Sequence, residues 1–345
     1  MTAFPNHSSI EPTSLAGLQH LGKYLASIQL ESGAIPGNKD GSHDPWDHLE
    51  AVMGLTTLGF RSEAELGLKW MRAHQNSDGS WCNKYLDTTV LEGNKQTNFS
   101  TYLAVAVWHF YLIYQDQKLL SLHWESIVKG INFALSMQEP HGAISWNLDE
   151  DGIVENDYLL TGCSSIAKSI ECGIAISKVL QKDTETDAWQ EAHAQLLLAI
   201  NSPEGIFDKT KDRSRFSMDW YYPILAGVSD PATIARLTNQ LKQNFWIEGL
   251  GIKCVSDEPW VTVAETSECS LALLKLGEHA FAEELLLNAI SIVNEDNIPY
   301  MGFQYEEGIY WPDETPSWTS AACILAADAN YQLTGASNLF ISTQA

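Results

Sequence analysis

The stretch Gln75-Asn-Ser-Asp-Gly-Ser-Trp81 decides the fold, because shortened copies of it recur along the whole chain. Each copy has an amide residue, a glycine four or five residues later and, in most copies, an aromatic or apolar residue after the glycine. The six glycines are Gly33, Gly79, Gly142, Gly205, Gly249 and Gly308. They lie 46, 63, 63, 44 and 59 residues apart, which leaves room for two helices and their loops in every interval. A period of this length is typical of a repeat architecture.

Helical periodicity fills the intervals in a regular alternation. An amphipathic stretch precedes each glycine, at 13–29, 62–75, 121–138, 187–201, 231–244 and 278–293. A more uniformly apolar stretch follows each glycine, at 46–58, 98–113, 162–179, 222–229, 263–276 and 317–331. Helices that are apolar on nearly all sides are buried, whereas amphipathic helices cover a surface. We therefore predict an all-α fold, an (α/α)6 toroid with an inner ring of six buried helices and an outer ring of six amphipathic ones. We expect residues 1–345 to form one domain, with flexible ends at 1–12 and 336–345.

Local signals indicate how these helices begin and end. Asp44-Pro45 supplies a cap and a proline at the first helical position, Thr262-Val-Ala-Glu265 has the spacing of a capping box, and Ser317 can cap the last inner helix. The repeated glycines are expected to end the outer helices in the left-handed conformation. Pro223 limits the fourth inner helix, so we expect Asp219 to lie in the loop before it.

The tract Gln75–Trp81 resembles the QW motif of the terpenoid cyclase and protein prenyltransferase toroids. Phrases such as Trp46-Asp-His-Leu-Glu50 and Thr161-Gly-Cys-Ser-Ser165 are similar to bacterial single-toroid proteins described as prenyltransferase-like. The resemblance implies the toroid and an isoprenoid substrate. It does not extend to the catalytic motifs, since the chain has no DxDD or DDxxD motif and does not reproduce the Asp, Cys and His zinc site.

Composition excludes several classes of partner. With 20 basic and 44 acidic residues the net charge is −24, which repels nucleic acid and anionic lipid. No apolar run reaches the ~20 residues of a membrane span, and no signal peptide is visible, so we expect a cytoplasmic protein with reduced cysteines. His43 and His48 lack a third partner for a metal, so we predict neither a metal nor a cofactor. The sequence does not give the oligomeric state.

The loops before the inner helices gather around one mouth of a toroid, and they hold the residues that could carry chemistry. Aromatic residues crowd these loops, where they could stack on a polyene, a carbocation or a sugar face. The predicted substrate-binding aromatics are Trp46, Trp81, Tyr85, Trp146, Trp220, Tyr221, Tyr222, Trp260, Trp311 and Trp318. Arg213, Arg215 and Lys253 form a basic group that could hold an anionic part of a substrate.

Carboxylates collect at the same mouth, and a pair of them in different surroundings is the minimal apparatus for acid/base catalysis. Asp47 and Glu265 have alternative roles as helix-capping acids, and Glu50 and Glu268 follow them by three residues on apolar helices. Asp219 has no such role and is the first choice for a catalytic acid.

Three functions remain open at this stage. The main one is an isoprenoid-directed enzyme in which an acid such as Asp219 protonates an alkene or epoxide. The first alternative is a carbohydrate-active (α/α)6 barrel, a glycosidase, lyase or epimerase, with tryptophans against a glycan and paired carboxylates across the bond. The second alternative is a binding protein without catalysis.

Overall fold

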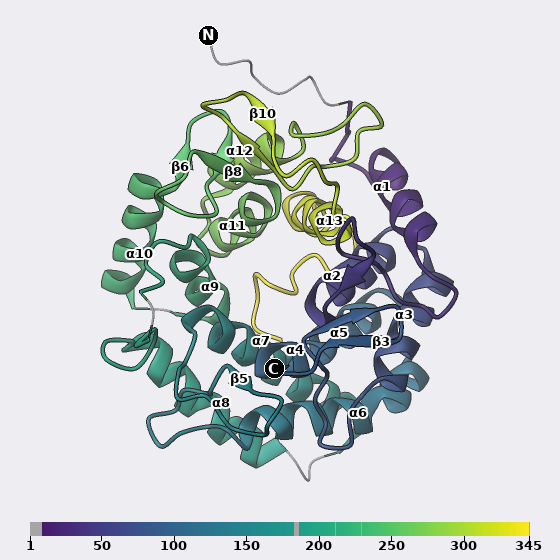
Figure 1. Ribbon diagram of the computed structural model, residues 1–345, viewed down its shortest axis with the longest axis vertical. Coiled ribbons are helices and arrows are strands. Elements are labelled where there is room, and N and C mark those ends of the chain that lie inside the picture. The colour runs from purple at the N-terminus through teal and green to yellow at the C-terminus, as the bar shows by residue number, and fades with distance from the viewer. Residues whose placement is uncertain (1–8, 183–185, 211, 229, 345) are drawn as a thin grey trace.

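The protein is an all-α ring of helical hairpins (Figure 1). The computed structural model describes residues 9–182, 186–210, 212–228 and 230–344. The outer helices are α1 (Leu15–Ile28), α3 (Arg61–Ala73), α6 (Gln117–Leu135), α8 (Thr186–Asn201), α10 (Pro231–Asn244) and α12 (His279–Ala289). The inner helices are α2 (Pro45–Thr57), α4 with α5 (Thr97–Thr101 and Leu103–Tyr114), α7 (Leu160–Leu180), α9 (Met218–Ala226), α11 (Val263–Lys275) and α13 (Ser317–Tyr331). The predicted (α/α)6 toroid is confirmed, and α2 closes the ring against α13.

The repeated amide and glycine explain how neighbouring hairpins are joined. The Gln75 side chain donates to the Gly79 carbonyl at 2.9 Å and to the Ser126 carbonyl of α6, the next outer helix, at 2.8 Å. Gly79 has a φ of +96°, and a Cβ there would lie 2.3 Å from the Lys129 carbonyl oxygen. The motif at Gln138 makes the same pair of bonds, to its own turn and to α8. In these copies the repeat therefore joins consecutive outer helices by side-chain hydrogen bonds.

The expectation about these glycines needs a correction. Helix α3 ends at Ala73, and Gly79 lies beyond it in a turn closed by its own N–H and the Asn76 carbonyl at 3.0 Å. The backbone is left-handed at all six glycines, as expected. At Gly33, Gly79 and Gly142 a Cβ would also collide with a carbonyl oxygen of the next outer helix, whereas a Cβ at Gly205 or Gly308 would meet nothing within 4 Å.

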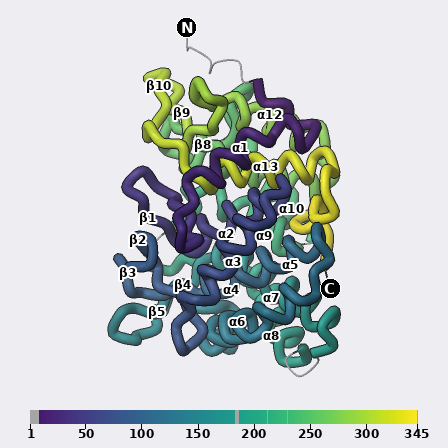
Figure 2. The backbone as a smooth tube through the Cα atoms, turned by 90° about the vertical axis from the view of Figure 1, so that its right-hand side faces the viewer, coloured from purple at the N-terminus to yellow at the C-terminus, as the bar shows by residue number. Residues whose placement is uncertain are grey.

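Short antiparallel strands occupy the loops at the end of the ring where the inner helices begin. One sheet joins β1 (Ser42–His43), β2 (Lys84–Leu86) and β3 (Thr89–Glu92), and another joins β8 (Trp260–Thr262), β9 (Gly302–Gln304) and β10 (Ile309–Tyr310). Two pairs complete the set, β4 (Lys95–Gln96) with β5 (Asn147–Leu148) and β6 (Trp246–Ile247) with β7 (Gly251–Ile252). Figure 2 shows strands β1 to β5 on one side of the molecule and the segment after α13 on the other.

Three local expectations were wrong. Thr262 stands before α11 but its side chain makes no cap hydrogen bond, and Ser317 is the first residue of α13 instead of its cap. Helix α9 begins at Met218 and contains Pro223, so Asp219 lies in its first turn and not in a loop. The start of α2 is as predicted, because the Asp44 side chain accepts from the Asp47 N–H at 2.9 Å and Pro45 follows at the first position.

The two predicted flexible ends have different outcomes. Residues 1–8 of the expected flexible start lie outside the described residues. The segment 336–344 differs from the expectation, because Ala336 and Leu339 are buried against the ring and anchor it. Among the described residues, no helix has the length and apolarity needed to cross a membrane.

Candidate active site

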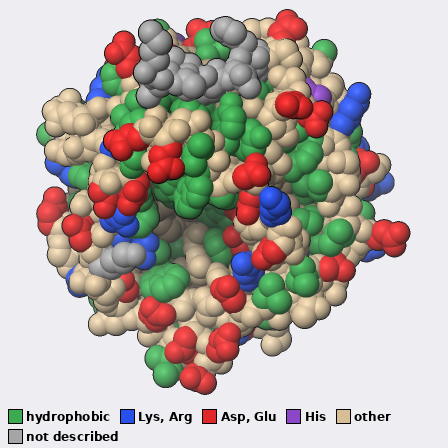
Figure 3. Space-filling view, turned by 45° about the horizontal axis from the view of Figure 1, so that its top comes forward, with side chains coloured by type: hydrophobic (Ala, Val, Ile, Leu, Met, Phe, Trp, Pro, Cys, Tyr) green, Lys and Arg blue, Asp and Glu red, His purple; other side chains and the backbone are tan. Residues whose placement is uncertain are grey.

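Three adjoining cavities run from the mouth of the ring to its centre. The outer one, of about 300 Å³, shares Asp44, Asp47, Phe99 and Trp318 with a middle one of about 270 Å³. The middle cavity in turn shares Trp46 and Glu268 with an inner one of about 30 Å³. Figure 3 shows a hollow near the centre of the molecular surface, with acidic and a few basic side chains around it. The cavities form one path along which a substrate can reach the ring centre.

The start of α2 brings two aspartates to this path. Asp44 caps the helix, and Asp47, the third helical residue, borders both the outer and the middle cavities. Burial raises the pKa of Asp44 to about 6. Burial, together with the charges of Asp44 and Glu50, raises the pKa of Asp47 well above its usual range. These surroundings favour the protonated form of Asp47, and the cap of α2 is made by Asp44 and not by Asp47.

The start of α11 brings a second carboxylate to the same cavity. Glu265 is the third residue of α11 and lines the middle cavity together with Asp47. Its Oε2 is buried and accepts no hydrogen bond from the described residues, while the Cys254 thiol lies against the carboxyl group. Because Thr262 makes no cap bond either, the predicted capping box does not form. Glu265 thus lines a cavity and has a carboxylate oxygen without a hydrogen-bond partner among the described residues, which suits a general base.

A second pair of acids lies deeper in the ring. Glu50 accepts a short hydrogen bond from the Tyr102 hydroxyl, and burial raises its pKa to about 7. Glu268 accepts from the hydroxyls of Tyr221 at 2.6 Å and Tyr222 at 2.7 Å. Burial and the charge of Glu50 raise the pKa of Glu268 to about 8. Both acids border the inner cavity, and their carboxyl oxygens accept hydrogen bonds from tyrosine hydroxyls.

Asp219, the first choice for the catalytic acid, lies behind the wall of the path. It accepts a short hydrogen bond from Thr161, whose side chain borders the middle cavity, but Asp219 itself borders none of the three cavities. Burial raises its pKa to about 6, and that of its neighbour Asp208 to about 7. It is positioned to orient Thr161 and not to reach a substrate, so we no longer favour it as the acid.

The ten aromatic residues fall into three groups. Trp46, Tyr222 and Trp318 line the path, and Tyr221 supports Glu268 from behind. Trp81 and Tyr85 lie in the core, at 0% and 2% exposure, and cannot touch a substrate. The rest lie away from the three cavities: Trp146 bonds to Glu155, Trp220 faces the side of α10, and Trp260 packs on Trp311.

The three basic side chains interact with other groups of the protein. Arg215 makes a bidentate pair with Asp257 at 2.8–3.0 Å, and Lys253 donates to the Ser256 carbonyl. Arg213 lies 3.9 Å from Asp208. None of the three borders the path, so we withdraw them as binding residues for an anionic substrate. Within the described ranges, no three His, Cys, Asp or Glu side chains come together as a metal site.

Several residues of the path escaped the sequence analysis. Tyr102 stacks on Trp46 with ring centroids 4.1 Å apart and planes 2° apart, and it interrupts the inner helix between α4 and α5. Phe99 and Phe340 line the outer part and the floor. Their only signal in the sequence was an apolar pattern. Tyr102 and Phe99 share this pattern with the buried core residues around them, so it does not distinguish them as residues of the path.

Comparisons with known proteins agree on the kind of molecule. No protein-family model matches the chain. The chain is 38% identical over 317 residues to an MMP endo-(1,4)-3-O-methyl-alpha-D-mannosidase from Mycolicibacterium hassiacum, covering 92% of this chain and 86% of that protein. A solved wild-type glycosidase superposes with a TM-score of 0.72 at 14% identity over 95% of this chain and 100% of its own. A GH63 mannosylglycerate hydrolase from Thermus thermophilus does so with a TM-score of 0.71 at 11% identity, over 89% and 99%.

These findings overturn the main functional interpretation of the sequence. The resemblance to terpenoid cyclases and prenyltransferases was wrong beyond the toroid itself. Those enzymes and the glycosidases that match this chain both close helical hairpins into a ring, and the QW-like tract indicates only the ring. The carbohydrate-active alternative agrees with the relative, and the protein is an enzyme. At 38% identity over nine-tenths of its length, the chain belongs to the family of this endo-mannosidase.

Proposed function

We propose that the protein is a glycoside hydrolase that cuts within an α-(1→4)-linked chain of 3-O-methylmannose. The observation that carries the proposal is the pair Asp47 and Glu265 on one cavity, the first with a raised pKa and the second with a carboxylate oxygen that has no hydrogen-bond partner among the described residues. The linkage and the methyl ether are those printed in the name of the mycobacterial relative.

In the proposed reaction Asp47 is the general acid. Its carboxyl proton passes to the glycosidic oxygen as the bond between that oxygen and the anomeric carbon breaks. Burial and the neighbouring charges raise the pKa of Asp47, which favours the protonated form that a general acid needs.

Glu265 is the general base. It takes a proton from a water molecule whose oxygen bonds to the anomeric carbon, so one water is consumed and the anomeric configuration is inverted. The open Oε2 beside a cavity of about 270 Å³ supports this role, because both a water and a sugar ring need space there.

Two parts of the path suit a methylated oligosaccharide. The inner cavity is small, and its walls are mostly apolar, which suits a methyl ether better than a hydroxyl. The outer cavity combines amides with aromatic rings, the usual partners of sugar hydroxyls and faces, and these side chains are Asn38, Asn83, Gln96, Phe99 and Trp318. It leaves room for the residues next to the one being cleaved.

The test is hydrolysis of a defined α-(1→4) oligosaccharide of 3-O-methylmannose, with its unmethylated counterpart as the control. We expect internal products from the methylated chain, with at least ~10-fold lower kcat/KM for the control. Proton NMR of the first turnovers should show the β-anomer at the new reducing end. Equal rates on both chains would refute the methyl preference, an α-anomer would refute the role of Glu265, and no hydrolysis of either would refute the proposal.

A further inference from the structure

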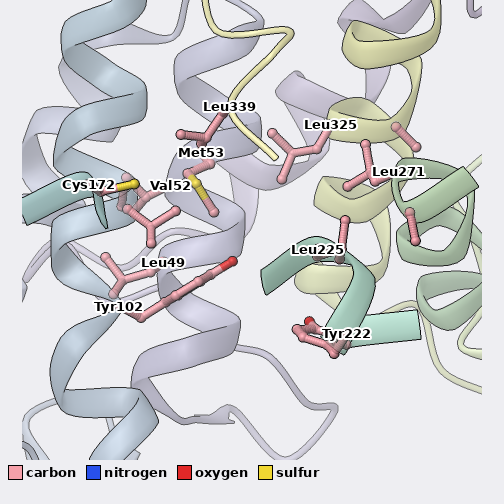
Figure 4. Close-up of a cluster of buried hydrophobic side chains, with 14 of the residues drawn as sticks. Leu49, Val52, Met53, Tyr102, Cys172, Tyr222, Leu225, Leu271, Leu325 and Leu339 are labelled. Atoms are coloured by element: carbon pink, nitrogen blue, oxygen red, sulfur yellow. The ribbon is translucent and has the colours of Figure 1, made fainter. Parts of the chain in front are cut away.

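The end of the ring opposite the mouth is closed by the segment that follows α13. After Tyr331 the chain turns at Gln332, whose φ is +54°, and Leu339 is then only 1% exposed. Figure 1 shows this segment crossing the middle of the ring, and in Figure 4 Leu339 lies near Met53 and Leu325 in the interior. Phe340, the next residue, lines the inner cavity. The segment therefore forms one wall of the inner cavity.

A buried ion pair on α7 holds the segment in place. Lys168 and Glu171 are 4% and 6% exposed and pair at 2.7 Å. Lys168 also donates to the Ser342 carbonyl at 3.0 Å, and Glu171 accepts from the Gln344 N–H at 2.7 Å. Removing two charges from water is costly unless further hydrogen bonds satisfy them. The segment supplies those bonds, so the pair acts as its latch.

A third contact fixes the last described residue. The Trp108 indole of α5 donates to the Gln344 side-chain oxygen at 3.0 Å. The segment is thus attached to two inner helices, α5 and α7, by side chains that point into the ring. Its attachment is specific and does not consist of apolar packing alone.

Phe340 differs from the other walls of the inner cavity. Leu225, Leu271 and Leu325 are fixed on helices α9, α11 and α13, whereas Phe340 lies on a segment without a helix or strand. Each of these leucines can move only with its helix, whereas the position of Phe340 depends on the Lys168–Glu171 pair that holds its segment. The volume of the cavity, about 30 Å³, therefore depends on one side chain that no helix of the ring carries.

We infer that Phe340 is the specificity-determining residue of the inner cavity and limits how large an alkyl group on the sugar it admits. This inference rests on the proposed function, in which that cavity holds the methyl ether. We expect the cavity of about 30 Å³ to accept a methyl group and a propyl group to collide with the Phe340 ring.

The test compares Phe340→Ala with Phe281→Ala, a half-buried phenylalanine of outer helix α12 that packs on Trp246. The probes are methyl mannosides that carry a 3-O-methyl or a 3-O-propyl group, with Kd measured by calorimetry. We expect the unaltered protein and Phe281→Ala to prefer the methyl ether. In Phe340→Ala the Kd ratio should shift by ~10-fold or more toward the propyl ether, because an opened pocket can accept it.

The outcomes separate this inference from the proposed function. A methyl preference that Phe340→Ala leaves unchanged would overturn the role of Phe340 and leave the proposed substrate standing. If the unaltered protein binds neither ether, the inference fails together with the substrate. Hydrolysis of the oligosaccharide then decides whether the hydrolase itself stands.

The latch has its own test, which needs no substrate. Replacing the pair in the double variant Lys168→Met and Glu171→Leu keeps its volume and removes both charges, so the ring should still fold. Deuterium exchange at the Gln344 amide should become at least ~10-fold faster, while exchange in α3, far from the segment, should not change. Unchanged exchange at Gln344 would show that the pair does not hold the segment.

Discussion

Helices α2 and α11 lie on either side of α13 and carry the same spacing of acids, yet they begin differently. Asp47 and Glu265 occupy the third position of each helix, and Glu50 and Glu268 follow one turn later. Helix α2 is capped by Asp44, whereas α11 has no side-chain cap. In α2 the cap satisfies the helix end, and its charge adds to burial in raising the pKa of Asp47. In α11 the uncapped end leaves Glu265 without such a partner. In the proposed reaction, the same spacing therefore supplies the acid on one helix and the base on the other.

The largest effect should come from Asp47→Asn. The amide keeps the shape of the carboxyl group but has no transferable proton, so kcat/KM should fall by ~10³-fold or more. The thermal midpoint should stay close to that of the unaltered protein, because Asp44 and not Asp47 makes the cap. Near-full activity would remove Asp47 from the reaction, and Asp219→Asn, measured beside it, would show whether the buried aspartate behind Thr161 acts instead.

Glu265→Gln should lower kcat/KM by ~10²-fold or more, because a neutral amide cannot accept the proton of the attacking water. Stability should be nearly unchanged, since the residue takes no part in a cap. A capping role for Glu265, as its spacing from Thr262 predicts, would instead make the substitution destabilising. A clear drop in the melting temperature would restore that interpretation and weaken the contrast between the two helices.

The deeper acids should make stability depend on pH. Glu268 has a pKa of about 8 in the folded protein against an ordinary value of 4.5, so it stays protonated when folded over a range in which the unfolded chain is ionised. Unfolding then releases a proton, and stability falls as pH rises from about 4.5 through about 8. Glu268→Gln should flatten that part of the curve in urea unfolding. An unchanged slope would mean that Glu268 is ionised in the folded protein.

Asp44→Asn should move the pH profile without harming the helix. Asparagine caps as well as aspartate, but it lacks the charge that raises the pKa of Asp47. The basic limb of kcat/KM should therefore shift to lower pH, which a pH–rate profile would detect. A limb that stays in place would assign it to another group, such as Glu50 or Glu268.

The smallest effects concern the caps themselves. Asp44→Ala should cost ~1 kcal/mol of unfolding free energy, because the Asp47 N–H loses its acceptor. Thr262→Val should change stability by less than ~0.5 kcal/mol, because the buried Thr262 hydroxyl has no partner among the described residues. Equal losses at the two positions would contradict the difference between the helix starts.

The local residues of the sequence determined the ring. The Gln75 and Gly79 pattern, repeated at helical-hairpin spacing, predicted six hairpins, and its copies at Gln29, Gln75 and Gln138 join one outer helix to the next. The apolar and amphipathic stretches predicted which helices are inner, since periodicity depends only on residues a few positions apart. Asp44 and Pro45 fixed the start of α2 for the same reason.

Only the tertiary structure decided which acids share a cavity and what surrounds them. Asp47 and Glu265 are far apart in the sequence, and their different surroundings arise from Asp44 in one case and an open oxygen in the other. No structural role for Asp219 was evident in the sequence, but in the structure it accepts a hydrogen bond from the Thr161 hydroxyl. The sequence predicted a flexible end around Phe340, whereas in the structure the buried Lys168–Glu171 pair on α7 binds this segment. Burial and long-range pairing set these properties, and neither can be read from neighbouring residues.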